Sequence, residues 1–256
     1  MRKTAGVEVA DYIGQLRLEG PRLAAAAVAA GLDAATPSCP EWVVRDLVRH
    51  LGGVHRWATT IVSSHRREPW DVELEEVVGD WPSDATLMEW FLEGHAGLVR
   101  ALCEADPLLE CWTFLPARSP LMMWARRQAH ETSVHRVDGE LARDGPITSF
   151  PQAFAADGVD ELLSCFITRR QRHSAARPDR TFRLRCTDAE GDWVVHVAPS
   201  GVETSSGPGS SDCEVAGRAM DLYLTLWNRR DPAGLSVDGD RDAFRDFLDG
   251  VHIRWS

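Results

Sequence analysis

The chain has 256 residues, of which 44% are hydrophobic and 26% are charged. These proportions are those of an ordinary soluble globular protein, and the length suits one large domain or two modest ones. The formal net charge of −11 argues against non-specific binding to nucleic acids or to anionic membranes. No apolar run approaches the length of a membrane span, and the N-terminal residues lack the apolar stretch of a signal peptide. We therefore expect a cytoplasmic protein without nucleic-acid or membrane partners.

The cysteines and the basic residues indicate the cellular compartment and the source of the protein rather than its reaction. The sequence has six cysteines without a CxxC pair, and a chain of this size does not need disulfides for stability, so we expect free thiols in a reducing compartment. Lys3 is the only lysine among 28 basic residues. This arginine bias, together with the alanine-rich stretches, is typical of GC-rich codons and indicates a high-GC, actinobacterial source.

The first part of the sequence predicts four helices, because apolar residues recur there at helical spacing. The predicted helices cover residues 6–31, 41–64, 84–105 and 118–143. Pro21 predicts an irregularity in the first helix, and Pro40 is well placed for the first turn of the second. Four helices of about twenty residues predict a bundle over residues 1–147, whose interior can hold a metal site.

A linker separates this bundle from a region with a different pattern. Residues 144–152 contain glycine and two prolines, which favour a connection without regular structure. The elements predicted beyond the linker are a helix, two strands joined by the turn at Glu190-Gly191, and a further helix. They cover residues 153–170, 181–188, 192–200 and 213–230. Two strands with helices over one face predict a small second domain over residues 152–256, so the chain as a whole is expected to be α+β.

The most informative segment is RRQAHETSVHRVDGELA, in the fourth predicted helix. Glu131 and His135 are four residues apart and project from one face, about 40° apart around the helix axis. Asp138 follows three residues later on the same face. A carboxylate and an imidazole on one stripe suit a divalent metal ion, with Asp138 orienting His135 from behind. The alternative is a solvated pair of side chains one helical turn apart.

A third metal ligand has to come from another helix. His50, within DLVRHLGGVHRW, is the best candidate because its helix face is otherwise apolar, although a histidine in such a position is more often a hydrogen-bonded core residue. His55 is five residues later and points elsewhere. The metalloprotease motif HExxH is excluded, because His130 and His135 are five residues apart, about 140° round the helix.

Two segments, taken together, resemble those of a known family. CPEWVVRDLVRHLGGVHRW and RRQAHETSVHRVDGELA look like the two signature segments of the mycothiol-dependent maleylpyruvate isomerase family. AADGVDELL, and GRAMDLYLTLWNRR followed by LSVDGD, are similar to its C-terminal domain, so the resemblance spans nearly the whole chain. The resemblance implies a DinB-like four-helix bundle followed by a smaller α+β domain. It also implies a metal ion, zinc in the isomerase, held by His50, Glu131 and His135.

The resemblance further implies an enzyme whose nucleophile is a low-molecular-weight thiol, mycothiol or a similar compound. The metal would lower the pKa of this thiol, and the thiolate would attack an electrophilic carbon. With a maleylpyruvate-like diacid the outcome is isomerisation, and with a substrate that carries a leaving group it is thiol transfer; the sequence does not choose between them. Two alternatives remain open. One is a non-catalytic protein that binds a metal or a small ligand, and the other is metal-assisted hydrolysis, for which Asp138 is the only nearby carboxylate to act as base.

Other residues are candidates for minor roles. Arg229 and Arg230, at the end of a helix in the second domain, could bind an anionic group of the thiol cofactor. Arg126 and Arg127 precede the ligand segment, and we expect them on a solvated face rather than at an anion site. Cys39 lies at a predicted helix start, where a thiolate is favoured, yet a structural role is expected because the external thiol supplies the sulfur. We expect a monomer whose partners are the small-molecule substrate and the thiol.

Overall fold

The computed structural model of the protein describes residues 7–170 and 179–251. The chain divides into two compact units, residues 1–148 and residues 149–256. No helix in the described ranges is both long and apolar enough to cross a bilayer. The architecture is α+β, as the sequence predicts: the first unit is helical, and the second combines helices with a sheet.

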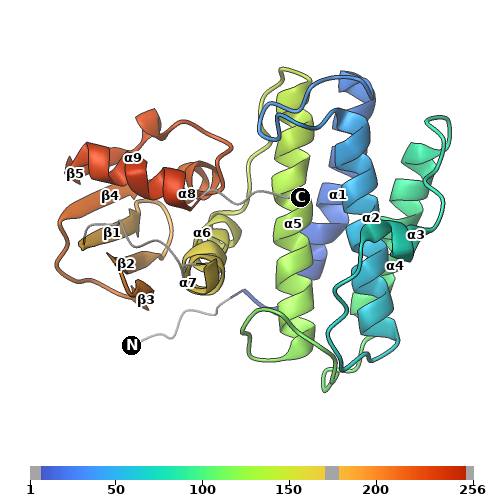
Figure 1. Cartoon of the computed structure of the whole chain (residues 1–256), viewed down its shortest axis with the longest axis horizontal. Helices are drawn as coiled ribbons and strands as arrows, with labels where there is room; N and C mark the ends of the chain where they lie inside the picture. Colours follow the sequence, from blue (N-terminus) through green and yellow to red (C-terminus); the bar gives the residue numbers. More distant parts are fainter. Residues whose placement is uncertain (1–6, 171–178, 252–256) are drawn as a thin grey trace. The chain divides into compact units, whose positions relative to one another are not determined.

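Among the described residues, the first unit is a bundle of four long helices (Figure 1). These helices are α1 (Val9–Ala30), α2 (Val44–Ser63), α4 (Leu87–Glu104) and α5 (Pro120–Ala142), and the short helix α3 (Leu74–Val78) lies between α2 and α4 in the chain. Helix α1 packs mainly against α5 and α4, and α2 packs mainly against α4 and α5. The helices that follow each other at the start of the chain, α1 and α2, are therefore diagonal neighbours. All four long helices are predicted from the sequence.

An apolar cluster fills the centre of this bundle. Leu23 of α1, Val48 and Leu51 of α2 and Phe91 of α4 are all fully buried within it. In α2 the buried apolar residues recur three or four positions apart, so that one side of the helix faces the cluster. This packing fixes the rotation of α2 about its axis and leaves His50 half-buried beside the core.

Two details of the first helices differ from the sequence prediction. Helix α1 continues without a break through Pro21. Helix α2 begins at Val44, because the preceding residues form two turns in which Cys39 N donates to Thr36 O (3.0 Å) and Trp42 N donates to Cys39 O (2.8 Å). The expectation that Cys39 lies at a helix start is therefore wrong.

Helix α5 is buried along most of its length, although many of its residues are polar. It begins after Ser119, whose hydroxyl accepts a hydrogen bond from Met122 N at 3.2 Å, a favourable N-cap. Further along, the fully buried Arg136 pairs with Glu19 of α1 and with Glu140 one turn later. Each buried charge in this network thus has an opposite charge beside it, which burial requires.

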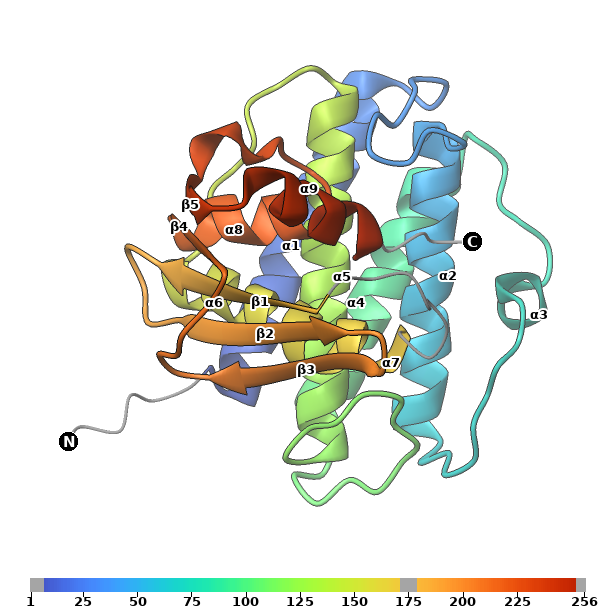
Figure 2. The ribbon, with the colours of Figure 1, turned by 60° about the vertical axis from the view of Figure 1, so that its left-hand side comes forward.

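In the described part of the chain, the second unit contains a five-stranded sheet with the order β3-β2-β1-β4-β5 (Figure 2). The strands are β1 (Arg180–Cys186), β2 (Asp192–Ala198), β3 (Gly201–Ser206), β4 (Cys213–Gly217) and β5 (Ser236–Gly239). Strands β1 and β4 are parallel, and the other neighbouring pairs are antiparallel. The helical elements are α6 (Gln152–Asp160), a π-helix (Glu161–Phe166), α7 (Ile167–Arg170), α8 (Ala219–Leu226), a 3₁₀-helix (Pro232–Gly234) and α9 (Arg241–Gly250).

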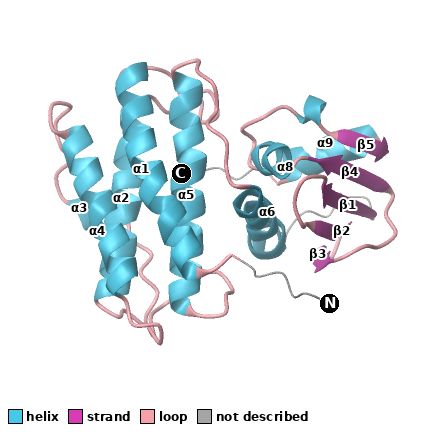
Figure 3. Cartoon of the chain, turned by 180° about the vertical axis from the view of Figure 1, so that it is seen from behind, coloured by secondary structure: helices cyan, strands magenta, loops and turns pink. Residues whose placement is uncertain are grey.

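One face of this sheet is apolar and the other carries ion pairs. Along β1 the side chains of Phe182 and Leu184 are buried, whereas Arg183 between them turns to the opposite face, as the two-residue period of a strand requires. There the Arg183 guanidinium pairs with Asp192 of β2 and Glu214 of β4. The apolar face is covered by helices, and Figure 3 shows α6 and α8 on one side of the strands.

The sheet is larger than the sequence prediction. The two predicted strands correspond to β1 and β2, but the segment from Cys213 onward is not entirely helical. Its first five residues form β4, in which Cys213 and Val215 are buried in alternation, and helix α8 starts only at Ala219. Strands β3 and β5 were also not predicted, because β3 is mostly polar and β5 has four residues.

We predict that Gly239→Ala destabilises the second unit. Gly239 has a φ of +107°, and an added Cβ would lie 2.4 Å from Asp212 O of the backbone. The free energy of unfolding should fall by about 1–3 kcal/mol through this strain, measured by urea denaturation. Gly234→Ala is the matched control, because a Cβ there meets nothing within 4 Å, and its effect should stay within about 0.5 kcal/mol. Equal losses in the two variants would contradict the prediction.

Candidate metal centre

Three side chains from two helices converge in the bundle. His50 comes from α2, and Glu131 and His135 come from α5, where continuous helix places them one turn apart on the same side. His50 Nε2 lies 3.5 Å from Glu131 Oε1, and His135 Nε2 lies 3.3 Å from the same oxygen. Glu131 and His135 are buried, and His50 is half-buried. A single carboxylate oxygen therefore faces two imidazole nitrogens.

This arrangement fits the requirements of a divalent ion. One donor atom from each of the three residues lies within 4.8 Å of the other two. Two donors that are each about 2.1 Å from a tetrahedral ion lie roughly 3.4 Å apart, close to the 3.3 Å and 3.5 Å separations from Oε1. Two imidazoles and one carboxylate are also a donor set that Zn²⁺ takes in catalytic sites, where a fourth position stays open. His50, Glu131 and His135 could therefore hold such an ion.

Asp138 orients His135 from the side away from Glu131. Its Oδ2 lies 2.8 Å from His135 Nδ1, and because a carboxylate can only accept, Nδ1 carries the hydrogen and Nε2 is left as a donor toward a metal. Ser38 Oγ donates to Asp138 Oδ1, and Cys39 Sγ lies 4.0 Å from Oδ2. The turn before α2 thus supports the buried Asp138, and Cys39 makes a structural contact there.

Arg127 balances the charge of Glu131. Its Nη2 lies 2.6 Å from Glu131 Oε2, and both side chains are almost completely buried. The expectation that Arg127 lies on a solvated face is therefore wrong. A signal was present in the sequence, since Arg127 precedes Glu131 by four residues, a spacing that brings opposite charges together on a helix. The two oxygens of Glu131 have different partners: Oε2 binds the arginine and Oε1 faces the histidines.

These contacts set the protonation of the group. Burial by itself raises the pKa of Glu131, but the charge of Arg127 and the adjacent imidazoles of His135 and His50 hold that pKa well below its usual range. Burial lowers the pKa of His50 despite the opposing effect of the nearby Glu131 carboxylate. Burial also acts to lower the pKa of His135, but Asp138 and Glu131 outweigh it and raise that pKa above its usual value. A metal ion at this position would displace the proton that these carboxylates favour on His135.

Trp42 lies beside two of the three donor residues, whereas His130 is not one of them. The ring centroid of Trp42 lies 4.8 Å from that of His50 and 6.0 Å from that of His135. His130 packs edge-on against Tyr12, with ring centroids 6.2 Å apart, and is not part of the cluster. The conclusion from helical spacing that His130 and His135 face different ways agrees with these contacts.

His55, the other histidine of the α2 segment, lies in the core. It is fully buried, its Nε2 is 2.9 Å from Thr132 Oγ1, and its ring centroid is 5.5 Å from those of Phe91 and His95. Burial, reinforced by the charge of His95, lowers the pKa of His55 well below its usual value. His55 is therefore neutral in the folded protein at neutral pH and is held away from the three donors.

Arg229 and Arg230 belong to the second unit and have partners there. Arg229 is buried and its Nη1 donates to Trp227 O at 2.7 Å. The Arg230 guanidinium forms an ion pair with Asp221 of α8. A role of either residue in binding the thiol stays a prediction.

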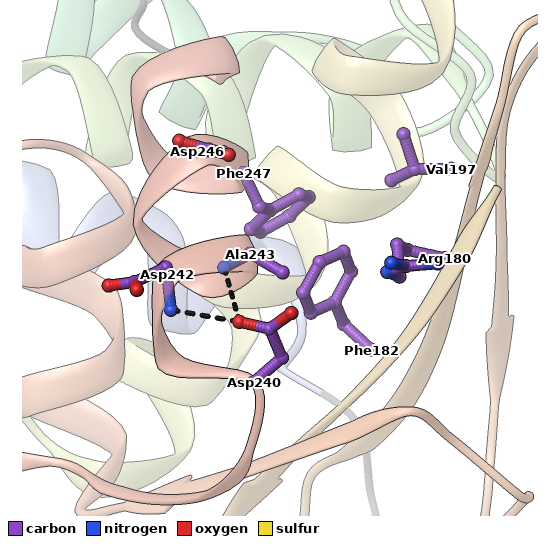
Figure 4. A pocket seen from close by; sticks show the side chains of 8 residues that line it. All are labelled: Arg180, Phe182, Val197, Asp240, Asp242, Ala243, Asp246 and Phe247. Carbon is purple, nitrogen blue, oxygen red and sulfur yellow. Dashed lines mark hydrogen bonds between the residues drawn. The ribbon is translucent and has the colours of Figure 1, made fainter. Parts of the chain in front are cut away.

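A separate cavity of about 210 Å³ lies within the second unit, between α9 and the strands β1 and β2 (Figure 4). The stacked rings of Phe182 and Phe247, with centroids 4.9 Å apart, form its apolar part. Asp240 lies at its edge and accepts hydrogen bonds from the backbone N–H of Asp242 (3.1 Å) and Ala243 (3.0 Å). This carboxylate therefore caps α9, which accounts for its position.

Both units of the chain match domains of one known family. Residues 14–139 match the mycothiol maleylpyruvate isomerase N-terminal domain, and residues 153–245 match the MDMPI C-terminal domain. The two matches together cover most of the chain. The chain belongs to the mycothiol-dependent maleylpyruvate isomerase family.

Solved structures support the same fold. The chain is similar to the crystal structure of the mycothiol-dependent maleylpyruvate isomerase, with a TM-score of 0.62 and 14% sequence identity over 91% of this chain and 93% of that chain. A variant of that isomerase with one histidine replaced by alanine gives a TM-score of 0.61 and 13% identity over the same shares. Among curated proteins, no sequence matches significantly. At this level of identity the likeness establishes the fold of the chain.

We predict that His55 makes the stability of the protein depend on pH. The unfolded chain takes up a proton on this histidine near pH 6.5, whereas burial keeps it neutral in the folded protein. The free energy of unfolding therefore decreases as the pH falls below about 6.5, by up to about 1.4 kcal/mol per pH unit for this one group. Urea denaturation of chelator-treated protein at several pH values measures the slope. The His55→Gln variant, which keeps an amide near Thr132 but cannot take up the proton, should show a shallower slope; an unchanged slope would refute the assignment.

Proposed function

We propose that the protein is a divalent-metal-dependent enzyme that uses a low-molecular-weight thiol, mycothiol or a close relative, as its nucleophile. Its substrate would be a maleylpyruvate-like diacid that is isomerised, or another electrophile to which the thiol is transferred. Membership of the family supports this proposal. The observation that carries it is the convergence of His50 Nε2 and His135 Nε2 on one oxygen of Glu131.

In this proposal His50, Glu131 and His135 are the metal ligands. A divalent ion such as Zn²⁺, when bound, supplies a positive charge that lowers the pKa of a coordinated thiol, so that thiolate is present at neutral pH. Asp138 keeps the hydrogen of His135 on Nδ1 and so keeps Nε2 available as a donor. Trp42 lies beside both histidine rings and would form part of the wall around a bound ion.

The reaction of the thiol differs between the two substrate classes. With a cis-enone diacid, sulfur adds to one carbon of the double bond and the electron pair moves onto the conjugated carbonyl. The former double bond can then rotate, and expulsion of the same thiolate gives the trans isomer with no net change in atoms. With a substrate that carries a leaving group, the carbon–sulfur bond replaces the bond to that group, and a thioether is the product.

We predict about one divalent ion per chain in protein purified without chelators, measured by elemental analysis. The ion should be lost in His50→Ala and in His135→Ala, because each removes one of three donors. His55→Gln is the matched control from the same helix and should retain the ion, since His55 contacts Thr132 instead. Wild-type protein that holds no metal and takes up no added Zn²⁺ would refute the metal-dependent function.

We predict that turnover of a conjugated cis diacid depends on an added low-molecular-weight thiol and is lost in Glu131→Ala. The assay follows the substrate's ultraviolet absorbance with and without thiol, after circular dichroism has verified that the variant is folded. Cys39→Ser should remain active, because the external thiol supplies the sulfur and the serine hydroxyl can still donate to Asp138.

The other outcomes of this assay separate the alternatives. Thiol-independent turnover would favour metal-assisted hydrolysis. Loss of turnover in Cys39→Ser would place the nucleophile on the protein. A metal-loaded protein that turns over no electrophile with any thiol would favour a non-catalytic metal- or ligand-binding role.

A further inference from the structure

We propose that Arg127 is a positioning residue of the metal centre: by binding Oε2 of Glu131 it leaves Oε1 as the single metal donor of that carboxylate. The inference rests on the proposed function, since it concerns the ion that His50, Glu131 and His135 would hold.

The geometry divides the two oxygens of Glu131 between different partners. Oε2 lies 2.6 Å from Arg127 Nη2, a charge-assisted hydrogen bond. Oε1 lies 3.5 Å from His50 Nε2 and 3.3 Å from His135 Nε2. Rotation of the carboxylate to bring both oxygens to an ion would break the contact with Arg127. Arg127 and Glu131 are almost completely buried, and breaking a charge-assisted contact between two buried groups is unfavourable.

This restriction has consequences for a bound ion. Carboxylates bind metals through one oxygen or through two, and a second oxygen from Glu131 would occupy a position that an incoming thiol needs. The charge of Arg127 also offsets part of the negative charge of Glu131, so the centre favours an anionic ligand more strongly than three ligands alone would. Arg127 thereby keeps a position open and makes it attractive to a thiolate.

Helix α5 contains a matched control for this effect. Arg136 is also buried and also pairs with a glutamate four residues later, Glu140. The oxygens of Glu140 accept hydrogen bonds from the backbone N–H (2.9 Å) and the hydroxyl (2.6 Å) of Thr148 rather than facing imidazoles. Arg136 also pairs with Glu19, so replacing it removes two buried ion pairs from the same helix without touching Glu131.

The experiment compares the wild type with Arg127→Met, Arg127→Gln, Arg127→Lys and Arg136→Met. The affinity for Zn²⁺ is measured by competition with a chelator, and the visible absorption of the Co²⁺-loaded protein reports coordination number, because four-coordinate Co²⁺ absorbs more strongly than five-coordinate Co²⁺. In Arg127→Met and Arg127→Gln the freed Oε2 can bind the ion and a positive charge beside the ion is lost, so the affinity for Zn²⁺ should rise several-fold and the Co²⁺ absorption should fall. Arg127→Lys, which keeps a charged donor for Oε2, should return both close to the wild-type values, and Arg136→Met should leave both unchanged.

The results that overturn the inference are distinct from those that overturn the proposed function. Unchanged affinity and absorption in Arg127→Met would overturn the role of Arg127 alone, and so would equal changes in Arg136→Met. If Arg127→Met does not fold, Arg127→Gln, which retains a polar side chain of moderate length, decides by the same criteria. A wild-type protein that binds neither Zn²⁺ nor Co²⁺ would instead overturn the metal-dependent function itself.

Discussion

The centre of the first unit is organised around one constraint, the burial of an ionised carboxylate. Glu131 has almost no contact with water, and removing such a charge from water costs several kcal/mol unless other groups compensate for it. Arg127 compensates on one oxygen and two histidines on the other. His135 in turn requires Asp138, and Asp138 requires Ser38 from the turn before α2. Each of these buried polar side chains thus has a polar or charged neighbour that compensates for its removal from water.

A second group of buried charges on α5 is compensated in the same way, because Arg136 lies between Glu19 and Glu140. Because of these two networks, α5 has polar residues on the sides that pack against other parts of the protein. It therefore lacks the clear apolar stripe of α2. The helix itself is nevertheless predicted from the sequence, over residues 118–143. Its burial could not be predicted, since a sequence of alternating arginines, glutamates and histidines is also that of a solvated helix. This explains why Arg127 was expected on a solvated face.

The sequence predicts those parts of the site whose residues are close together in the chain, and it does not predict the contacts between distant segments. The placement of Glu131, His135 and Asp138 on one side of α5 depends only on helical spacing, so the sequence predicts it directly. His50 lies on another helix, and its selection over His55 depended on the apolar face of α2 and on the resemblance to a family. The contacts of Ser38 and Cys39 with Asp138 join residues about a hundred positions apart, and no local pattern indicates them.

In the second unit, the sequence predicts the strands in which apolar and polar residues alternate. It does not predict the strands that are defined mainly by their pairing with other strands. Strands β1 and β2 alternate clearly and are joined by a short turn, whereas β3 has exposed Glu203 and Ser205 and, among the strands of the described residues, pairs with β2 alone. Strand β4 is immediately followed by a helix, and its parallel partner β1 lies about thirty residues earlier. Pairing of this kind is a tertiary property, because the fold rather than the segment supplies the hydrogen-bonding partner.

The spacing of functional residues along α5 also bears on how this family can change in evolution. Arg127, Glu131, His135 and Asp138 follow each other at intervals of four, four and three residues, so all four share one side of the helix. Inserting or deleting a single residue between Arg127 and Asp138 would rotate everything downstream by about 100°. The same rotation would turn Arg136 away from Glu19. A change in the length of α5 between these residues would therefore disrupt both buried networks at once, whereas a change in the length of a loop between helices would disrupt neither.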